Sequence, residues 1–330
     1  MVFLTGDTHG GFKRIALFCS RMKTTKDDIM IILGDAGINF YYKPNKKYHT
    51  DWLTKRTISD IPITLFCIHG NHEQRPANLP NYHLIDFHGG KAWIEDDFPN
   101  IIFAKDGEIY DFDGNKCIVI GGAYSIDKEY RIPLGAWWSD EQPSNEIKEY
   151  VEKQLDKAKW KVNCVFSHTV PLKYEPTEVF LKGVDQSKVD KSTEKWLDSI
   201  ENKLDYEHWY AGHYHTEKTI DKLTIMFEDY QCLEPNAKKT VKKTKEAPKN
   251  AKIVETPASE QSSETEEPKK RGRKPKTNKA AEATNVAEIS KEPSATPKKR
   301  GRKPKIVSDT FAKKQSELPK KRGRKPKKKE

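Results

Sequence analysis

Five short segments rich in aspartate, histidine and asparagine are the part of this sequence best suited to chemistry. They read GDTHG at 6–10, LGD at 33–35, HGNHE at 69–73, SHT at 167–169 and GHYH at 212–215. Carboxylate, imidazole and amide oxygen groups are the ligands that hard and borderline divalent cations prefer. A pair of such cations lowers the pKa of a water molecule and neutralises charge on phosphoryl oxygens. The segments therefore indicate metal-assisted hydrolysis of phosphate esters.

The spacing within the segments supports a shared metal site. Asp7 and His9 are two residues apart at the end of an apolar run, so their side chains point the same way. Asp35 offers one carboxylate that is suited to bridge two cations, and Asn71 offers a neutral oxygen. Three further imidazoles complete the candidate ligands: His168, His213 and His215.

Short runs rich in Val, Ile and Phe precede most of these segments and predict the strands that position them. We expect strands at 2–5, 29–33, 63–68, 116–120, 163–166, 209–211 and 224–227. Residues 101–104 and 108–112, separated by Lys105-Asp106-Gly107, predict a β-hairpin. Apolar residues at helical spacing predict helices at 12–22, 51–58, 147–160 and 193–204.

This order of elements predicts an α/β fold: a β-sandwich with helices on its outer faces. The polar segments stand at the carboxyl ends of predicted strands, where sites gather in such folds. The sandwich is expected to occupy residues 1–235, which are long enough for one domain with a full core.

The charge divides the 330-residue chain into two unlike parts. Residues 1–235 carry 29 Lys and Arg against 37 Asp and Glu, a net charge of −8, whereas residues 236–330 carry 31 against 12, a net charge of +19. The second part has one aromatic residue, Phe311, so it cannot bury enough apolar surface to offset the entropy of folding. We expect residues 236–330 to form a disordered basic tail.

Cysteine usage and hydropathy constrain the compartment. The five Cys are odd in number, lack a CxxC spacing and lie mostly in apolar runs, which predicts buried free thiols in a reducing compartment. The start of the chain shows no signal peptide, and no apolar run approaches the roughly 18 residues of a membrane-spanning helix. No membrane partner is expected.

The order and residue types of the five segments resemble the calcineurin-like metallophosphoesterase family over about residues 1–230, with GNHE and GHYH both intact. The alternative is that they are ordinary capping aspartates and core histidines. The resemblance implies two divalent metal ions, with Mn favoured and Fe, Zn or Ni also suited. It implies that the first is held by Asp7, His9, Asp35 and His215. It implies that the second is held by Asp35, Asn71, His168 and His213.

The resemblance also implies a catalytic role for His72, which follows Asn71. His72 would protonate the leaving-group oxygen as a general acid while a metal hydroxide attacks in line and Asp35 bridges the metals. The adjacent Glu73 or a neighbouring carboxylate is expected to orient His72. The glycines of the segments fit tight turns where backbone approaches the metals.

One departure from the family concerns protein phosphatases, which carry GDxxDRG as the second segment and an Arg before GNHE. Here the second segment reads GDAGINF at 34–40, and His69 precedes Gly70. The two arginines that would bind a phosphorylated side chain are absent, which argues against a phosphoprotein substrate. Arg75 and Arg131 are candidate partial substitutes.

Aromatic residues supply candidate contacts to the organic part of a substrate. Arg131, Trp137 and Trp138 would form a substrate wall, since aromatics stack on bases and Arg pairs with phosphate. The alternative, which we favour, is that both tryptophans cap the core. Tyr41 follows the second segment and is a candidate to line the cleft.

The tail contains PKKRGRKPK three times, at 268–276, 297–305 and 319–327. This sequence resembles the AT-hook, whose Arg-Gly-Arg centre lies in the minor groove of A·T-rich DNA. Glycine lets the backbone reach the groove floor, and the narrow groove attracts arginine. The alternatives are a solvated basic tail and a nuclear import signal. The candidate DNA-binding residues are Arg271, Gly272, Arg273, Arg300, Gly301, Arg302, Arg322, Gly323 and Arg324.

Together these features predict a metal-dependent phosphoesterase that is tethered to A·T-rich DNA by its tail. A phosphodiester, with nucleic acid a candidate, is the favoured substrate. One alternative is a phosphomonoesterase or protein phosphatase localised to DNA, and another is a non-catalytic DNA-binding protein with a vestigial metal domain. The expected compartment is nucleoid-associated cytoplasm in a bacterium or phage, and the nucleus in a eukaryote.

Overall fold

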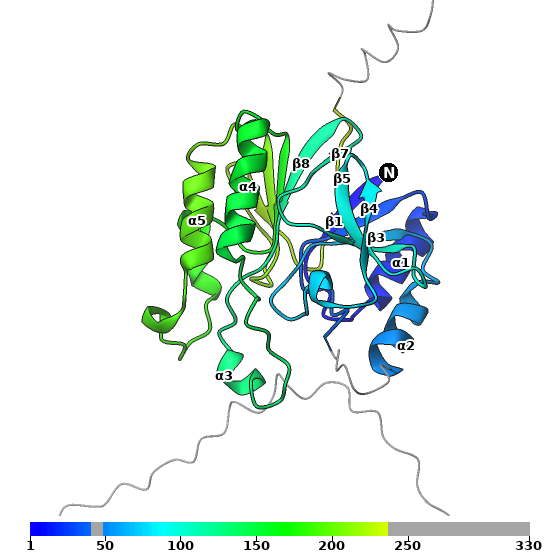
Figure 1. The fold of residues 1–330 in the computed structure, drawn as a ribbon, viewed down its shortest axis with the longest axis horizontal. Coiled ribbons are helices and arrows are strands. Elements are labelled where there is room, and N and C mark those ends of the chain that lie inside the picture. Colours follow the sequence, from blue (N-terminus) through cyan, green and yellow to red (C-terminus); the bar gives the residue numbers. More distant parts are fainter. Residues whose placement is uncertain (41–48, 237–330) are drawn as a thin grey trace, which may run out of the picture. The chain divides into compact units, whose positions relative to one another are not determined.

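A computed structural model describes residues 1–40 and 49–236, which form two β-sheets packed face to face with helices outside them (Figure 1). The expected α/β sandwich with outer helices is confirmed. The tail, its repeats and Tyr41 lie outside the described residues, so the tail boundary and DNA contacts stay predictions.

The first sheet has seven strands in the order β13-β1-β2-β3-β6-β5-β4. Its strands β1, β2, β3 and β6 are mutually parallel, whereas β13, β5 and β4 run antiparallel to their neighbours. The bounds are Val2–Thr5 (β1), Ile29–Ile32 (β2), Thr64–Cys67 (β3), His83–Phe87 (β4), Gly90–Ile94 (β5), Ile101–Ala104 (β6) and Gln231–Cys232 (β13).

The second sheet has six strands in the order β11-β12-β10-β9-β8-β7. Its four central strands are parallel, and β7 and β11 close the edges in antiparallel pairs. The bounds are Ile109–Phe112 (β7), Asn115–Ile120 (β8), Cys164–Ser167 (β9), His208–Ala211 (β10), Lys218–Ile220 (β11) and Leu223–Ile225 (β12).

Helices cover the outer face of each sheet. The predicted helices are confirmed to within a few residues as α1 (Lys13–Met22), α2 (His49–Ile58), α4 (Asn145–Lys157) and α5 (Ser192–Glu201). A short helix, α3 (Lys128–Arg131), lies away from both sheets, in the lower part of Figure 1. Among the described residues, no helix is long and apolar enough to cross a membrane.

Three apolar clusters hold these layers together. The central cluster joins side chains from both sheets, such as Leu4 and Phe66 from the first and Phe166 from the second. A second cluster packs α1 and α2 on the first sheet, and a third packs α4 and α5 on the second. Four of the five cysteines are buried and all five are free, as expected. The core therefore fixes the two sheets, and with them the loops at the strand ends.

The predicted hairpin at 101–112 is wrong. Strand β6 pairs with β3 and β5 in the first sheet, whereas β7 pairs with β8 in the second. Residues 105–107 carry the chain from one sheet to the other, and the backbone N–H of Gly107 donates to the carbonyl of Val119 (2.8 Å). All four residues of β6 are buried, so this strand needs partners on both edges, which a hairpin alone would not supply.

Candidate metal centre

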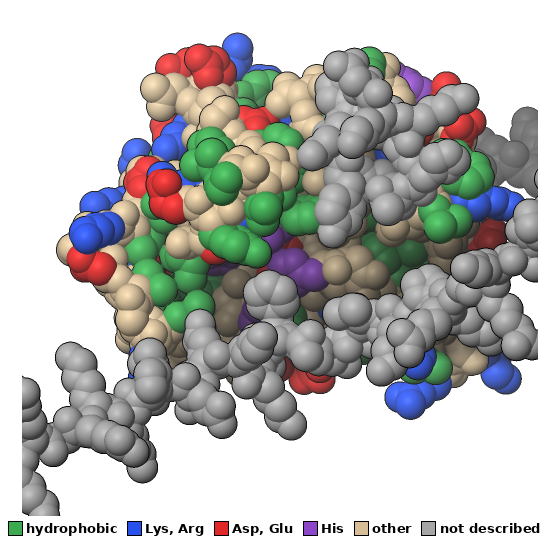
Figure 2. Space-filling view, turned by 90° about the horizontal axis from the view of Figure 1, so that it is seen from below, with side chains coloured by type: hydrophobic (Ala, Val, Ile, Leu, Met, Phe, Trp, Pro, Cys, Tyr) green, Lys and Arg blue, Asp and Glu red, His purple; other side chains and the backbone are tan. Residues whose placement is uncertain are grey.

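The five polar segments meet at one end of the sandwich. Each follows or closes a parallel strand: β1, β2 and β3 in the first sheet, β9 and β10 in the second. Backbone hydrogen bonds join the loops. The N–H of His9 donates to the carbonyl of Asp35 (2.8 Å), and the N–H of Gly212 donates to the carbonyl of His168 (2.9 Å). In Figure 2 histidine side chains lie at the bottom of a hollow on this face.

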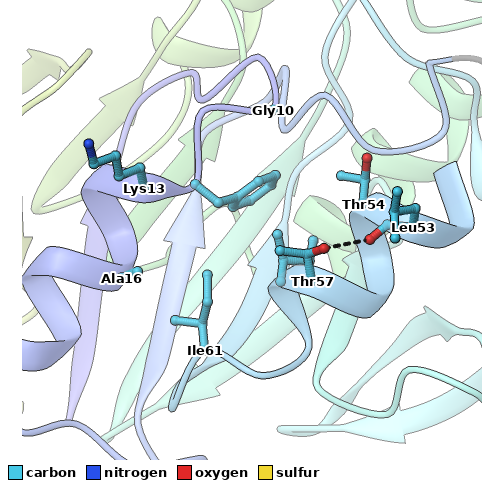
Figure 3. A pocket seen from close by; sticks show the side chains of 9 residues that line it. Gly10, Lys13, Ala16, Leu53, Thr54, Thr57 and Ile61 are labelled. Carbon is cyan, nitrogen blue, oxygen red and sulfur yellow. Dashed lines mark hydrogen bonds between the residues drawn. The ribbon is translucent and has the colours of Figure 1, made fainter. Parts of the chain in front are cut away.

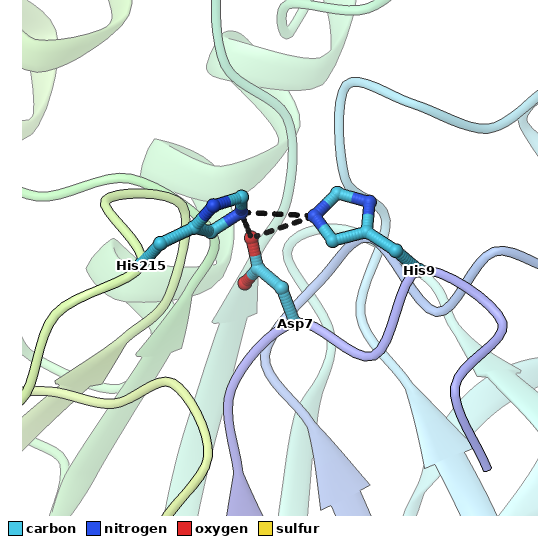
Figure 4. Close-up of side chains that lie close together, drawn as sticks. All are labelled: Asp7, His9 and His215. Carbon is cyan, nitrogen blue, oxygen red and sulfur yellow. Dashed lines mark hydrogen bonds and ion pairs between the residues drawn. The ribbon is translucent and has the colours of Figure 1, made fainter. Parts of the chain in front are cut away.

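One group of ligand atoms comes from Asp7, His9 and His215 (Figure 4). The Nε2 atom of His215 lies 3.1 Å from Asp7 Oδ2 and 2.9 Å from His9 Nε2. The distance from His9 Nε2 to Asp7 Oδ2 is 3.7 Å. The three side chains thus point at one small volume, although Asp7 and His215 are 208 positions apart in the sequence.

A second group converges on the side-chain oxygen of Asn71. His168 Nε2 lies 2.8 Å from Asn71 Oδ1, and His213 Nδ1 lies 3.1 Å from the same atom. The other ring nitrogen of His168, Nδ1, is 2.8 Å from the carbonyl of Leu33. A carbonyl only accepts, so Nδ1 carries the proton and Nε2 presents its lone pair toward Asn71, as a metal ligand requires.

Asp35 lies between the two groups. Its Oδ2 is 3.9 Å from His9 Nε2, and its Oδ1 is 3.7 Å from His168 Nε2. The backbone N–H of His72 donates to Oδ1 (2.8 Å) and fixes the carboxylate. The two oxygens of one carboxylate thus face different imidazole groups, which is the arrangement that a bridging ligand needs.

The electrostatics of the buried carboxylates favour a bound cation. Asp7 and Asp35 are almost fully buried, and within residues 1–40 and 49–236 no Lys or Arg forms an ion pair with either. Burial opposes ionisation of both groups, but the imidazoles of His215 and His168 outweigh it and hold the pKa of each carboxyl group below its usual range. Two buried negative charges without a strong cationic partner are costly, and divalent metal ions would neutralise them.

The pKa shifts of His213 and His215 act in opposite directions on metal binding. Burial lowers the pKa of His213 to about 3, so its ring is neutral near pH 7 and keeps a lone pair. The hydrogen bond to Asp7 raises the pKa of His215 and favours its protonated ring, so a metal ion bound there would replace that proton. The donor set, two carboxylates, one amide and four imidazoles, fits borderline divalent cations.

The backbone at these positions is strained. Four of the seven candidate ligands have left-handed φ angles: His9 (44°), Asp35 (46°), His213 (70°) and His215 (49°). Such conformations are uncommon for residues with a Cβ and cluster at functional sites. These four positions thus hold backbone conformations that other residues of the fold must stabilise.

Two glycines permit the close approach of the loops. At Gly34, where φ is 99°, an added Cβ would lie 2.0 Å from Nδ1 of His168. At Gly70, it would lie 2.0 Å from Oδ1 of Asp35. Any side chain at either position would displace a candidate ligand, so the glycines of the motif are required by space.

These observations are matched by the sequence comparison, in which the model of the calcineurin-like phosphoesterase family matches residues 1–217. The chain belongs to the calcineurin-like phosphoesterase family. Members of this family are metal-dependent, and three groups of His and Asp residues here place ligand atoms within 4.8 Å of one another: Asp7, His9, His215; His9, Asp35, His72; and Asp7, Asp35, His168.

Two solved structures are distantly similar to this chain. The crystal structure of TT1561 of Thermus thermophilus is 12% identical, with a TM-score of 0.38, over 69% of this chain and 89% of that one. A second crystal structure is 14% identical, also with a TM-score of 0.38, over 68% of this chain and 88% of that one. No curated protein matches the chain significantly.

His72 lies beside the candidate metal ligands, half-buried, with its ring centroid 5.3 Å from that of His9. Burial lowers its pKa, although Asp35 opposes this shift. Of the two alternatives expected to orient His72, Glu73 is not supported, because its carboxylate is buried and accepts from the backbone N–H of Gly70 (3.1 Å). The carboxylates that act on His72 are Asp35 and Asp127.

Arg131 and Arg75 do not take the substrate-facing positions expected of them. Arg131 is 4% exposed, and its guanidinium donates to the carbonyl of Asn71 (3.2 and 3.3 Å) and to the hydroxyl of Ser125. Arg75 is 8% exposed and pairs with Asp106. The Arg131 guanidinium and the Nε and Nη1 atoms of Arg75 are bound to protein atoms, whereas Arg75 Nη2 is buried without a partner among the described residues. Their placement supports a structural role in the loops around the cluster.

The favoured interpretation of the two tryptophans is also not supported. Trp137 and Trp138 are half-buried and belong to none of the three apolar clusters. The indole N–H of Trp137 donates to Glu141 (2.8 Å), and the ring of Trp138 packs edge-on against Phe40 (centroids 5.9 Å apart). They pack on the loops that surround the metal centre.

Arg14 is a site residue that the sequence analysis missed. Its guanidinium donates to the carbonyls of Gly6 (3.1 Å), Asp7 (3.0 Å) and Phe227 (3.0 Å) and to the hydroxyl of Thr5 (2.6 Å). It thereby ties the loop that carries Asp7 to the segment after β12. Its targets are mostly main-chain carbonyls, which no residue-type motif marks.

A hollow of a different kind lies apart from the candidate metal ligands. A groove of about 490 Å³ separates α1 from α2 (Figure 3). Its lining contains no Asp, Glu or His and is mostly apolar: Gly10, Phe12, Lys13, Ala16, Leu53, Thr54, Thr57, Ile58 and Ile61. This groove therefore does not mark the reactive site, which is set by the polar segments.

Proposed function

We propose that this protein is a dinuclear-metal-dependent phosphoesterase that favours phosphodiesters and is held on A·T-rich DNA by its tail. The observation that carries the proposal is Asp35, whose two oxygens face separate groups of imidazoles at 3.9 and 3.7 Å. One group supplies Asp7, His9 and His215, and the other supplies Asn71, His168 and His213.

Two divalent ions, with manganese favoured, would lower the pKa of a water molecule between them and neutralise charge on the phosphoryl oxygens. The residues perform the remaining tasks. Asp35 fixes the separation of the two ligand groups, and the Leu33 carbonyl holds the His168 tautomer. His72, at the edge of the cluster, donates a proton to the leaving oxygen from its ring. Its lowered pKa predicts that this donation weakens as the pH rises.

The preference for diesters rests on the arginines. A phosphomonoester carries more negative charge than a diester, and guanidinium groups are the usual partners of such oxygens. Arg131 and Arg75, the candidates for that task, are committed to Asn71, Ser125 and Asp106. A substrate with less charge at phosphorus suits this site better.

The test compares hydrolysis of 4-nitrophenyl phosphate and bis(4-nitrophenyl) phosphate by the full-length protein with Mn²⁺. Asp35→Asn is the catalytic blank, and His83→Ala is the matched control, since His83 is an exposed histidine on β4. Diester preference that Asp35→Asn abolishes and His83→Ala retains is expected. Monoester preference would mean that the tail localises a phosphatase, and equal weak turnover by all proteins would leave a DNA-binding protein.

The proposed binding to DNA is supported by three identical PKKRGRKPK repeats in a segment of net charge +19. Alanine in place of the six arginines at 271, 273, 300, 302, 322 and 324 should abolish the preference for A·T-rich over G·C-rich duplexes, measured by fluorescence anisotropy of the full-length protein. Hydrolysis of the small chromogenic diester should be unchanged. Equal binding of both duplexes by the unmodified protein would reduce the tail to a nonspecific polycation.

A further inference from the structure

A small cavity lies next to the loop that follows β10 in the second sheet. Tyr214, which stands between the candidate ligands His213 and His215, forms one wall. Its volume is about 70 Å³, several times the roughly 10–15 Å³ that one water molecule needs. The side chains that matter below are Tyr124, Glu175, Phe180, Lys191, Glu194 and Tyr214.

Two of the walls are flat. The rings of Phe180 and Tyr214 are nearly parallel, with an angle of 17° between their planes and centroids 6.1 Å apart. Both are half-buried, and the ammonium of Lys191 lies 4.7 Å from the centroid of Phe180. Aromatic faces in this setting favour a planar ring as the ligand.

A buried carboxylate lies at the same cavity. Glu194 is 4% exposed, and its Oε1 accepts from the hydroxyl of Thr169 (2.9 Å). Among residues 1–40 and 49–236, its Oε2 has no hydrogen-bond partner. A buried acceptor without a donor is costly, so this atom is positioned for a donor that the protein does not itself provide.

The neighbouring charged groups leave Glu194 free for that donor. The ammonium of Lys191 is bound to Glu175 (2.6 Å), which also lies 3.4 Å from the hydroxyl of Tyr214. Burial raises the pKa of Glu194 to about 7, so the carboxylate, which only accepts, predominates at pH 8. The cavity therefore offers aromatic faces and one unpaired anionic acceptor.

We propose, on the basis of the function proposed above, that this cavity binds the base of a nucleotide substrate and selects bases with an exocyclic amino group. The ring packs against Tyr214 and Phe180, and the amino group donates to Glu194 Oε2. Carboxylates accept from such amino groups, as from N4 of cytosine, whereas uracil presents a carbonyl oxygen at that position. The ring centroid of Tyr214 lies 4.9 Å from that of the candidate ligand His213, so a base against Tyr214 would lie near the ligand set that is to receive its phosphate.

The test measures the dissociation constants of cytidine and uridine by saturation-transfer NMR on the full-length protein at pH 8 without metal. Cytidine should bind about tenfold more tightly than uridine, since one charge-assisted hydrogen bond is at stake. Glu194→Gln should remove this preference, and Phe180→Leu should weaken both nucleosides. Glu178→Gln, an exposed carboxylate in the same segment, is the matched control and should change neither.

Equal binding of the two nucleosides, no binding by the folded protein, or a preference that survives Glu194→Gln would overturn the proposal and leave a water-filled cavity. The readout needs neither metal nor hydrolysis. A protein that binds cytidine through Glu194 yet hydrolyses no phosphate ester would keep this site and lose the proposed function. A protein that hydrolyses diesters but does not bind cytidine would keep the proposed function and lose this site.

Discussion

The guanidinium of Arg131 reaches across 60 residues of sequence to donate two hydrogen bonds to the backbone carbonyl of Asn71. Asn71 is the candidate ligand on which His168 and His213 converge, so Arg131 sets the position of that ligand from behind. Asp127 (2.9 Å) and Glu141 (3.7 Å) neutralise the buried guanidinium charge. The loop of α3 is thereby coupled to the metal centre.

We predict that Arg131→Lys weakens Mn²⁺ binding and diester hydrolysis by about ten- to a hundredfold, the range typical of residues that orient metal ligands. Lysine keeps the charge but cannot reproduce the two N–H groups that both donate to the Asn71 carbonyl. Isothermal titration with Mn²⁺ and the melting temperature separate the effect from unfolding. Wild-type metal affinity in a folded variant would contradict the positioning role.

Gly70→Ala should abolish activity while leaving most of the fold intact. The added Cβ would lie 2.0 Å from Oδ1 of Asp35, which must then leave its place between the two ligand groups. Gly89→Ala is the control, because a Cβ there meets nothing within 4 Å even though φ is +86°. The control should cost roughly 1 kcal/mol of stability and no activity. Equal activity loss in both variants would point to general destabilisation.

Metal binding should stabilise the folded protein measurably. Asp7 and Asp35 are 2% and 1% exposed, and a cation relieves their mutual repulsion only in the folded state. Saturating Mn²⁺ at about a hundred times its dissociation constant would add about 2.7 kcal/mol per site. Calorimetry should therefore show a higher melting temperature with Mn²⁺ than with EDTA. Asp35→Asn should shrink this difference, and an unchanged difference would remove Asp35 from the ligand set.

The sequence predicted the site well because its residue types carry the chemistry. The strand ends after 2–5, 29–33 and 63–68 were visible as apolar runs closed by Gly, Asp or His, and parallel pairing brings such ends together. What the pattern could not supply is the contact between an arginine and a main-chain carbonyl. Arg14 and Arg131 act in this way, and every residue type offers the same carbonyl.

The errors in the fold arose where local pattern and tertiary pairing differ. Lys105-Asp106-Gly107 has the composition of a hairpin turn, yet it passes between sheets, because β6 and β7 each find a closer partner elsewhere. The hairpin of β4 and β5 was missed, since most of β4 is exposed and lacks an apolar alternation. Its turn, His88-Gly89, has positive φ at both positions (46° and 86°), a signal that Gly89 alone hinted at.

The raised pKa of Glu194 predicts an unusual dependence of the protein's stability on pH. Burial raises its pKa from an ordinary 4.5 to about 7 in the folded protein, so the folded state binds this proton more tightly than the unfolded state. Its contribution to stability is therefore fully present below pH 4.5 and is lost as the pH rises through 7. Glu175 and Lys191 act on the same group, and both residues are present in the wild type and in a Glu194 variant.

Glu194→Gln cannot ionise, so its stability relative to the wild type should rise between pH 5 and pH 8. At roughly 1.4 kcal/mol per pKa unit, the shift corresponds to about 3 kcal/mol. Urea denaturation of both proteins at the two pH values measures this double difference and cancels groups common to both. A relative stability that is flat with pH would mean that Glu194 titrates normally, and with it the acceptor in the cavity beside Tyr214 would lose its buried character.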